Sequence, residues 1–209
     1  MKQGLFTGVV IDNQDPERIG RVRVQIPGTD EDIWARIATL MAGNDRGTWF
    51  IPEVSDEVLV GFEEGAVRRA YVIGGLWSKA SPPPEKMAES NNRKVLRSRN
   101  GVKITLDDEN GQESCVVETP GGQKITLKDG PGSVDIRDSN GNSVTLAAGG
   151  ISVNAAAKVT INASEVEVNA GMVNLNAAMS KFSGVVQCDT LISNNVVSSS
   201  YSPGAGNVW

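Results

Sequence analysis

Apolar and polar residues alternate in several short stretches of the first 80 residues. The clearest stretch is Gly20–Pro27, in which three apolar residues alternate with polar ones. A period of two residues predicts a half-buried β-strand. Further short apolar runs predict strands at Leu5–Ile11, Ile33–Ala38, Val58–Phe62 and Ala70–Trp77. Glycine and proline separate the runs, and no helical pattern lies between them.

Five short strands within 80 residues favour a small closed barrel, and an OB-type barrel has this number of strands. OB-folds often bind oligonucleotides through a basic groove with stacked aromatic side chains. This segment instead has a net charge of −3 and contains acidic runs at Asp30–Asp32 and Glu63–Glu64. We therefore expect its aromatic residues to belong to the barrel core and interface rather than to stack bases: Trp34, Trp49, Phe50, Tyr71 and Trp77.

A second pattern follows the proline-rich break at residues 81–84. Three similar units run from Gly101 to Leu106, Gly122 to Leu127 and Gly141 to Leu146. From residue 150 the period shortens, and Asn-Ala recurs at residues 154, 162, 169 and 176, each time after an alternating apolar pair. Each unit predicts a short strand next to a tight turn or corner. The predicted domains are a barrel (1–80), a linker (81–94), a repeat array (95–200) and a C-terminal tip segment (201–209).

A strand of about seven residues cannot bury two apolar side chains alone, so the repeats must stack and close into a prism. One chain could supply every wall by coiling, or three chains could supply one wall each. About 50 residues make little more than two turns of a single-chain coil, which favours the trimer, although periodicity alone leaves both open. The residues expected in the core between chains are Ile104, Leu106, Ile125, Leu127, Val144, Leu146, Ile151, Val153, Val159, Ile161, Val166, Val168, Val173 and Leu175.

Composition argues against several classes of function. The 209 residues include no histidine and two cysteines, so the chain can build neither a Ser-His-Asp triad nor a histidine-containing or four-cysteine zinc site. We expect no cofactor and no metal. The net charge of −5 lacks the basic footprint of a nucleic-acid-binding protein. Residues 151–209 carry only three acidic side chains, so we expect no enzyme of the polysaccharide-cleaving solenoid type.

Targeting signals and reactive groups add little information about the function of the chain. No apolar region of a signal peptide and no membrane-spanning stretch is visible, so we expect synthesis in the cytoplasm. Cys115 and Cys188 lie far apart, and we expect free thiols, with a disulfide between them as the alternative. The acidic run Asp107–Gly111 lacks the spaced ligands of an EF-hand, so we expect a charged hairpin turn there.

Several motifs resemble one known family. Gly8–Asp12 and Asp15–Pro27 are similar to the OB domain of spike proteins of contractile injection machines, the VgrG and phage baseplate assembly protein V families. The resemblance continues in the same order through Trp34–Arg36, Gly47–Pro52, Asp56–Phe62, Tyr71–Trp77 and Ser98–Asp108.

This resemblance implies an all-β fold, with an N-terminal OB-fold barrel followed by an intertwined trimeric triple-stranded β-helix, or β-prism. It also implies a homotrimeric structural spike that lies below the tail tube and is driven through a target envelope. Full-length VgrG proteins begin with a large hub portion, and because the first OB strand here begins near Leu5, we expect the hub to be a separate chain. The alternatives are a trimeric fibre or adhesin stalk and, less favoured, an OB-fold nucleic-acid-binding protein.

The tip of the spike is expected to need a partner. Some phage spikes end in a histidine-coordinated metal, which this chain cannot build. We therefore expect a separate PAAR-type tip protein, with a frayed terminus as the alternative for the last residues. The location implied is a phage tail-like particle assembled in the bacterial cytoplasm, in which the spike meets the target membrane only mechanically. The residues expected to contact the tip protein are Tyr201, Pro203, Gly204, Val208 and Trp209.

Overall fold

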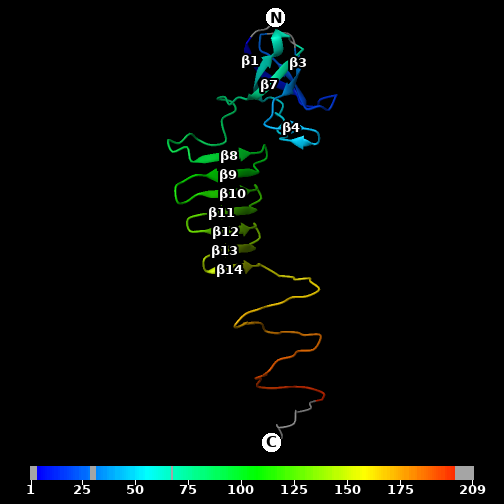
Figure 1. The fold of residues 1–209 in the computed structure, drawn as a ribbon, viewed down its shortest axis with the longest axis vertical. Coiled ribbons are helices and arrows are strands. Elements are labelled where there is room, and N and C mark those ends of the chain that lie inside the picture. Colours follow the sequence, from blue (N-terminus) through cyan, green and yellow to red (C-terminus); the bar gives the residue numbers. More distant parts are fainter. Residues whose placement is uncertain (1–3, 29–31, 67, 201–209) are drawn as a thin grey trace. The chain divides into compact units, whose positions relative to one another are not determined.

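The computed structural model describes residues 4–28, 32–66 and 68–200. The chain divides into two units, Met1–Val159 and Thr160–Trp209. The first unit contains a barrel and a separate seven-stranded sheet, and the second, as far as residue 200, is drawn without strands (Figure 1). The helical content of the described residues is a single short 3₁₀ turn, Glu63–Gly65. The fold is therefore all-β, as the sequence predicts.

Five strands close the barrel in the order β1-β2-β3-β7-β6. Neighbouring strands are antiparallel except β3 and β7, which are parallel. This arrangement is that of an OB-like barrel. Each strand lies where a strand is predicted: β1 (Leu5–Asp12), β2 (Arg21–Gln25), β3 (Asp32–Ile37), β6 (Glu57–Phe62) and β7 (Ala70–Gly75).

Small and β-branched residues fill the barrel core. Val22 and Val24, which alternate with arginines along β2, are fully buried. Gly8 of β1 lies directly against the side chain of Val24, where a larger residue would collide. Phe6 and Phe62 pack edge to face beside this core, with their ring centroids 5.5 Å apart. The barrel is thus a self-contained core that needs no second chain.

The expectation that the large aromatic residues belong to the barrel core and interface is wrong for the core, and their place at an interface stays a prediction. The guanidinium groups of Arg21 and Arg36 lie over the rings of Trp34 and Tyr71, 5.7 and 5.8 Å from the ring centroids. A narrow barrel already filled by valine and alanine leaves no space for such rings. The three remaining aromatic residues are exposed: Trp49, Phe50 and Trp77.

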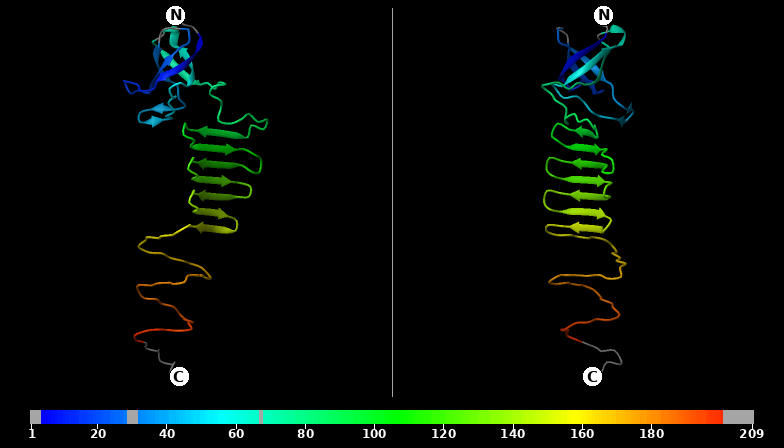
Figure 2. Two further views of the ribbon diagram at one scale, coloured as in Figure 1. Left: turned by 180° about the vertical axis from the view of Figure 1, so that it is seen from behind. Right: turned by 90° about the vertical axis from the view of Figure 1, so that its left-hand side faces the viewer.

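A two-stranded hairpin lies between β3 and β6, and the sequence pattern does not predict it. Its strands are β4 (Ala42–Gly43) and β5 (Arg46–Gly47), paired antiparallel. Two further contacts join its arms, because the N–H of Thr48 donates to the carbonyl of Met41 (2.9 Å) and the hydroxyl of Thr39 donates to the carbonyl of Thr48 (2.9 Å). Both views in Figure 2 show this hairpin outside the barrel. We call residues 39–50 the arm.

Seven antiparallel strands form the sheet, each paired with the next along the chain. The three glycine-led units of the sequence contain β9, β11 and β13, and the strands between them are not predicted. Gly101, Gly122 and Gly141 share a φ near +90°, a conformation that glycine adopts without strain. The strands are β8 (Arg93–Arg97), β9 (Lys103–Asp107), β10 (Ser114–Glu118), β11 (Lys124–Lys128), β12 (Ser133–Arg137), β13 (Ser143–Ala147) and β14 (Gly150–Asn154).

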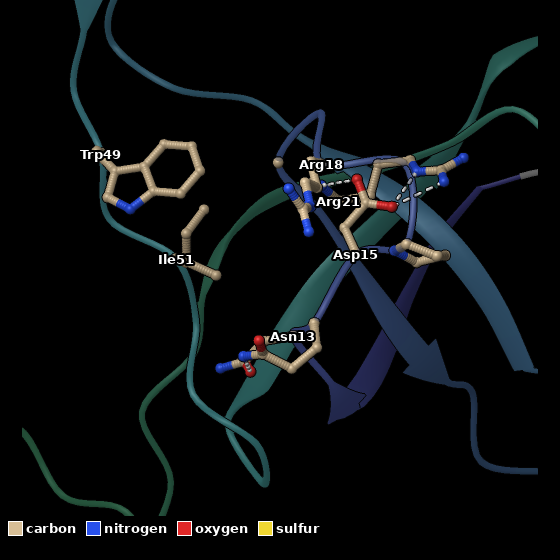
Figure 3. Close-up of a pocket in the computed structure, with 9 residues that line it drawn as sticks. Asn13, Asp15, Arg18, Arg21, Trp49 and Ile51 are labelled. Carbon is tan, nitrogen blue, oxygen red and sulfur yellow. Dashed lines mark hydrogen bonds and ion pairs between the residues drawn. The ribbon is translucent and has the colours of Figure 1, made fainter.

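Two carboxylates hold loops in place. Asp15 accepts hydrogen bonds from the backbone N–H groups of Ile19 (2.9 Å) and Arg21 (3.2 Å). It also forms a short ion pair with the Arg21 guanidinium (2.8 Å), which Figure 3 shows. Bonding to Arg21 keeps the pKa of Asp15 well below its ordinary value. Asp138 similarly accepts from the side chain (2.7 Å) and backbone (2.8 Å) of Asn142, which lowers its pKa to about 2.

The Asp15 contacts predict an acid-sensitive barrel. A carboxylate whose pKa is lowered by folding stabilises the fold above its unfolded pKa, and this contribution is lost as the pH falls toward its folded pKa. We expect the barrel to lose stability below about pH 4 in the wild type, and Asp15→Asn to reduce that loss while lowering stability at pH 7. Urea unfolding followed by tryptophan fluorescence at pH 7, 4 and 3 measures both effects.

Asp45→Asn, at the exposed tip of the arm, is the matched control and should unfold like the wild type at pH 7. Equal acid sensitivity in the wild type and Asp15→Asn would show that the Asp15 contacts do not stabilise the barrel.

Candidate self-association interface

The register of the sheet separates an apolar face from a polar one. Residues directly opposite each other on neighbouring strands project to the same side, as do residues two apart on one strand. Ile104 and Leu106 of β9 therefore share a face with their partners on the next strands. This face carries two columns of side chains: Ile104, Val117, Ile125, Ile136, Val144 and Val153 in one, and Leu106, Cys115, Leu127, Val134, Leu146 and Ile151 in the other.

No described residue of the chain covers this apolar face. Ile104 is 38% exposed, Leu127 46% and Ile151 73%, although each lies within a regular sheet. Val144 is half-buried between its neighbours. Burial of a large aliphatic side chain contributes about 1.5–3 kcal/mol, so the eight exposed aliphatic residues of this face represent a large unused driving force. An exposed apolar surface this continuous is typical of an interface with another chain.

The opposite face of the sheet carries mostly polar side chains, several of which pair with one another, whereas the buried hydroxyl of Thr105 has no hydrogen-bond partner among the described residues. Lys103 pairs with Glu118 directly across the strands at 3.0 Å, and this contact lowers the pKa of Glu118. The hydroxyl of Thr145 donates to Asp135 at 2.8 Å, the leading cause of the lowered pKa of that carboxyl. The two faces therefore differ in the polarity of their side chains, although Thr105, which is 6% exposed, is buried on the polar face.

Residues 155–200 lack the backbone partners that an extended chain needs. Figure 1 shows this segment crossing back and forth without strands. Within the described part of the chain, its hydrogen bonds are contacts of polar side chains, such as Asn142 with the N–H of Ala156 (2.9 Å) and Asn169 with Glu167 (2.9 Å). Unpaired backbone groups are costly when buried, so such a segment needs partner strands from elsewhere.

The structure places the predicted core residues in two settings. Eight lie in the two columns of the sheet, from Ile104 to Val153. The other six are exposed in the strandless segment: Val159, Ile161, Val166, Val168, Val173 and Leu175. Their burial between chains stays a prediction. The predicted tip contacts, Tyr201, Pro203, Gly204, Val208 and Trp209, lie outside the described residues.

Sequence reasoning missed four of the twelve members of the apolar face, together with Leu96, which lies opposite Ile104 on β8. Val134 and Ile136 alternate with polar residues in β12, a period-two signal that could have identified them. Leu96, Cys115 and Val117 carry a weaker signal, because β10 contains two consecutive valines that hide its alternation.

Cys115 is half-buried within a column, and Cys188 is exposed, and both are free thiols.

Two hollows on the barrel offer little chemistry. One of about 450 Å³ lies between Trp49 and Ile51 on one side and Asn13, Asp15 and Arg18 on the other (Figure 3). The buried carboxylate in this hollow, that of Asp15, already accepts hydrogen bonds from Arg21 and from the backbone of its loop.

The second hollow, of about 300 Å³, has its polar groups engaged in the same way. Tyr71 donates to Glu63 at 2.7 Å, which raises the pKa of Tyr71, and Glu63 also pairs with Arg69 at 3.4 Å. Within the described ranges no group of three or more acidic or cysteine side chains is arranged to hold a metal, and no helix is long and apolar enough to cross a membrane. The apolar face of the sheet is thus the surface whose chemistry points most clearly to a function, namely self-association.

Family models match both structured parts of the chain. Residues 6–77, which include the whole barrel, match the type VI secretion system/phage-baseplate injector OB domain. Residues 114–174 match the phage baseplate V C-terminal trimerisation domain. The second match covers β10 to β14 together with the first part of the strandless segment, where the apolar face and the unpaired backbone meet.

Curated relatives are spike proteins. The type VI secretion system spike protein VgrG4b of Pseudomonas aeruginosa is 34% identical over 114 residues, which covers 48% of this chain and 14% of that protein. The spike protein of Escherichia phage P2 is 31% identical over 90 residues, covering 43% of this chain and 41% of that protein. The chain thus spans less than half the length of either relative. By these matches the chain belongs to the family of phage baseplate V and VgrG spike proteins.

Proposed function

We propose that the chain is the structural subunit of a homotrimeric central spike in a contractile tail or injection machine. The observation that carries this proposal is the uncovered apolar face of β9 to β14, which runs into a segment without backbone partners. The match to a trimerisation domain covers most of this face, from β10 to β14, and the first part of the segment. A threefold arrangement supplies what each chain lacks, because two further copies bury the face and pair with the segment.

The two parts of the repeat array would assemble differently. Strands β8 to β14 already pair within one chain, so each chain contributes one complete wall with its apolar face toward the threefold axis. From residue 155 onward the strands have to pair between chains, and the three chains interleave. Walls that close on each other leave no open strand edges along the rod, which protects it against aggregation.

The function of such a rod is mechanical rather than catalytic. Breaking it requires many stacked strands from three chains to separate together, so it resists force along its length. The proposal includes a tail hub at the barrel end, a PAAR-type protein at the C-terminal end, and assembly in the bacterial cytoplasm into a tail-like particle. It includes no cofactor and no nucleic acid, and contact with a target membrane only during puncture.

The solution mass tests the trimer. We expect the purified full chain to scatter light as a particle close to three times 22.1 kDa. Leu127→Lys, on the apolar face, should abolish this particle or lower its thermal stability strongly, because three uncompensated charges would be buried at a cost of several kcal/mol each.

Thr126→Lys is the matched control, because Thr126 is adjacent on the same strand but lies on the polar face opposite Asp135. It should leave the trimer intact. A monomeric wild type, or equal loss of the trimer in the two variants, would contradict the proposed interface.

A further inference from the structure

We propose that the arm, residues 39–50, binds the barrel of a second copy of this chain within the trimer. This inference rests on the proposed function, since it needs the copies to be held together. The arm is a formed hairpin, yet its large apolar side chains are mostly exposed among the described residues, although the Trp49 ring lies over Gly20 of its own barrel. Its exposed apolar residues are Leu40 (97%), Met41 (52%), Trp49 (76%) and Phe50 (72%).

Backbone contacts fix the conformation of the arm. Gly47 has a φ of +152°, and a Cβ there would press against the carbonyl of Met41. The N–H of Thr48 donates to that same carbonyl at 2.9 Å. At its base, the Trp49 ring lies over Gly20 of the barrel, within about 4 Å of where a Cβ would stand. A two-stranded ribbon is marginally stable in water, so a shape this defined needs packing against something else.

The size of the apolar surface argues for a tethered partner. Four such side chains present roughly 500 Å², less than the roughly 800 Å² per partner of a stable free complex. A freely diffusing protein would therefore dissociate readily from the arm. A second copy of the barrel would not, because it is held nearby by the trimer.

The length of the linker limits how far apart the barrels of the three copies can lie. Residues 76–92 connect each barrel to its sheet and reach at most about 60 Å when fully extended. Three barrels within that distance of a common axis meet at an effective concentration on the order of millimolar. Under threefold symmetry each copy can give its arm to one neighbour and receive an arm from the other, which closes a ring.

Photo-cross-linking of the full chain tests this contact. With benzoylphenylalanine in place of Phe50, illumination of the purified trimer should yield covalent species of two and three times 22.1 kDa. Peptide mass spectrometry should place the second end of the link within residues 5–77 of the neighbouring chain. Leu40→Ser in the same background should lower the yield roughly fivefold or more, because losing one buried leucine shifts an equilibrium by that factor.

Met87→Ser is the matched control, since Met87 is an exposed apolar residue of the linker, outside both the arm and the barrel, and it should leave the yield unchanged. Cross-links only within one chain, no cross-links, or cross-links to the sheet in a sample of trimeric mass would overturn the arm contact and leave the proposed function standing. Cross-linking to a different protein in assembled particles would assign the arm to that protein instead. A monomeric mass would overturn both proposals.

Discussion

Backbone hydrogen bonding is the constraint on which the rest of this molecule depends. An extended chain must pair its N–H and C=O groups with another strand or leave them in water. Strands β8 to β14 find these partners within their own chain, whereas the extended segment after Asn154 does not. The same segment carries regularly spaced valines, isoleucines and leucines, which favour burial. Further copies of the same segment meet both needs, because they supply backbone partners and cover the apolar side chains.

The barrel and the repeat array therefore differ in whether they need other chains in order to bury their apolar residues. The barrel closes on itself and buries valines such as Val22 and Val60 completely. The sheet leaves eight of the twelve residues of its apolar face exposed among the described parts of the chain. A barrel that folds on its own, joined to a rod that forms only on assembly, suits a spike, because the barrel can fold before the three chains associate through the repeat array.

Much of this architecture could be predicted from local alternation. The period of two residues in β2 and the repeated Lys-Ile-Thr-Leu of β9 and β11 identify strands and their buried sides directly. The arm could not be predicted, because its two-residue strands are too short to show a period. The exposure of Trp49 and Trp77 was equally hidden, since the narrow width of the barrel decides that its core excludes large rings. Pairing between chains leaves no mark in the sequence beyond the apolar spacing itself.

Hydrogen–deuterium exchange of residues 159–175 in the full chain tests most directly whether other copies complete these strands. The amides of this segment have no backbone acceptor in their own chain. If strands from two other chains supply the acceptors, the amides should exchange orders of magnitude more slowly than in a free peptide of the same sequence. Exchange at the rate of the free peptide, in a sample that keeps its barrel and sheet folded, would contradict the account.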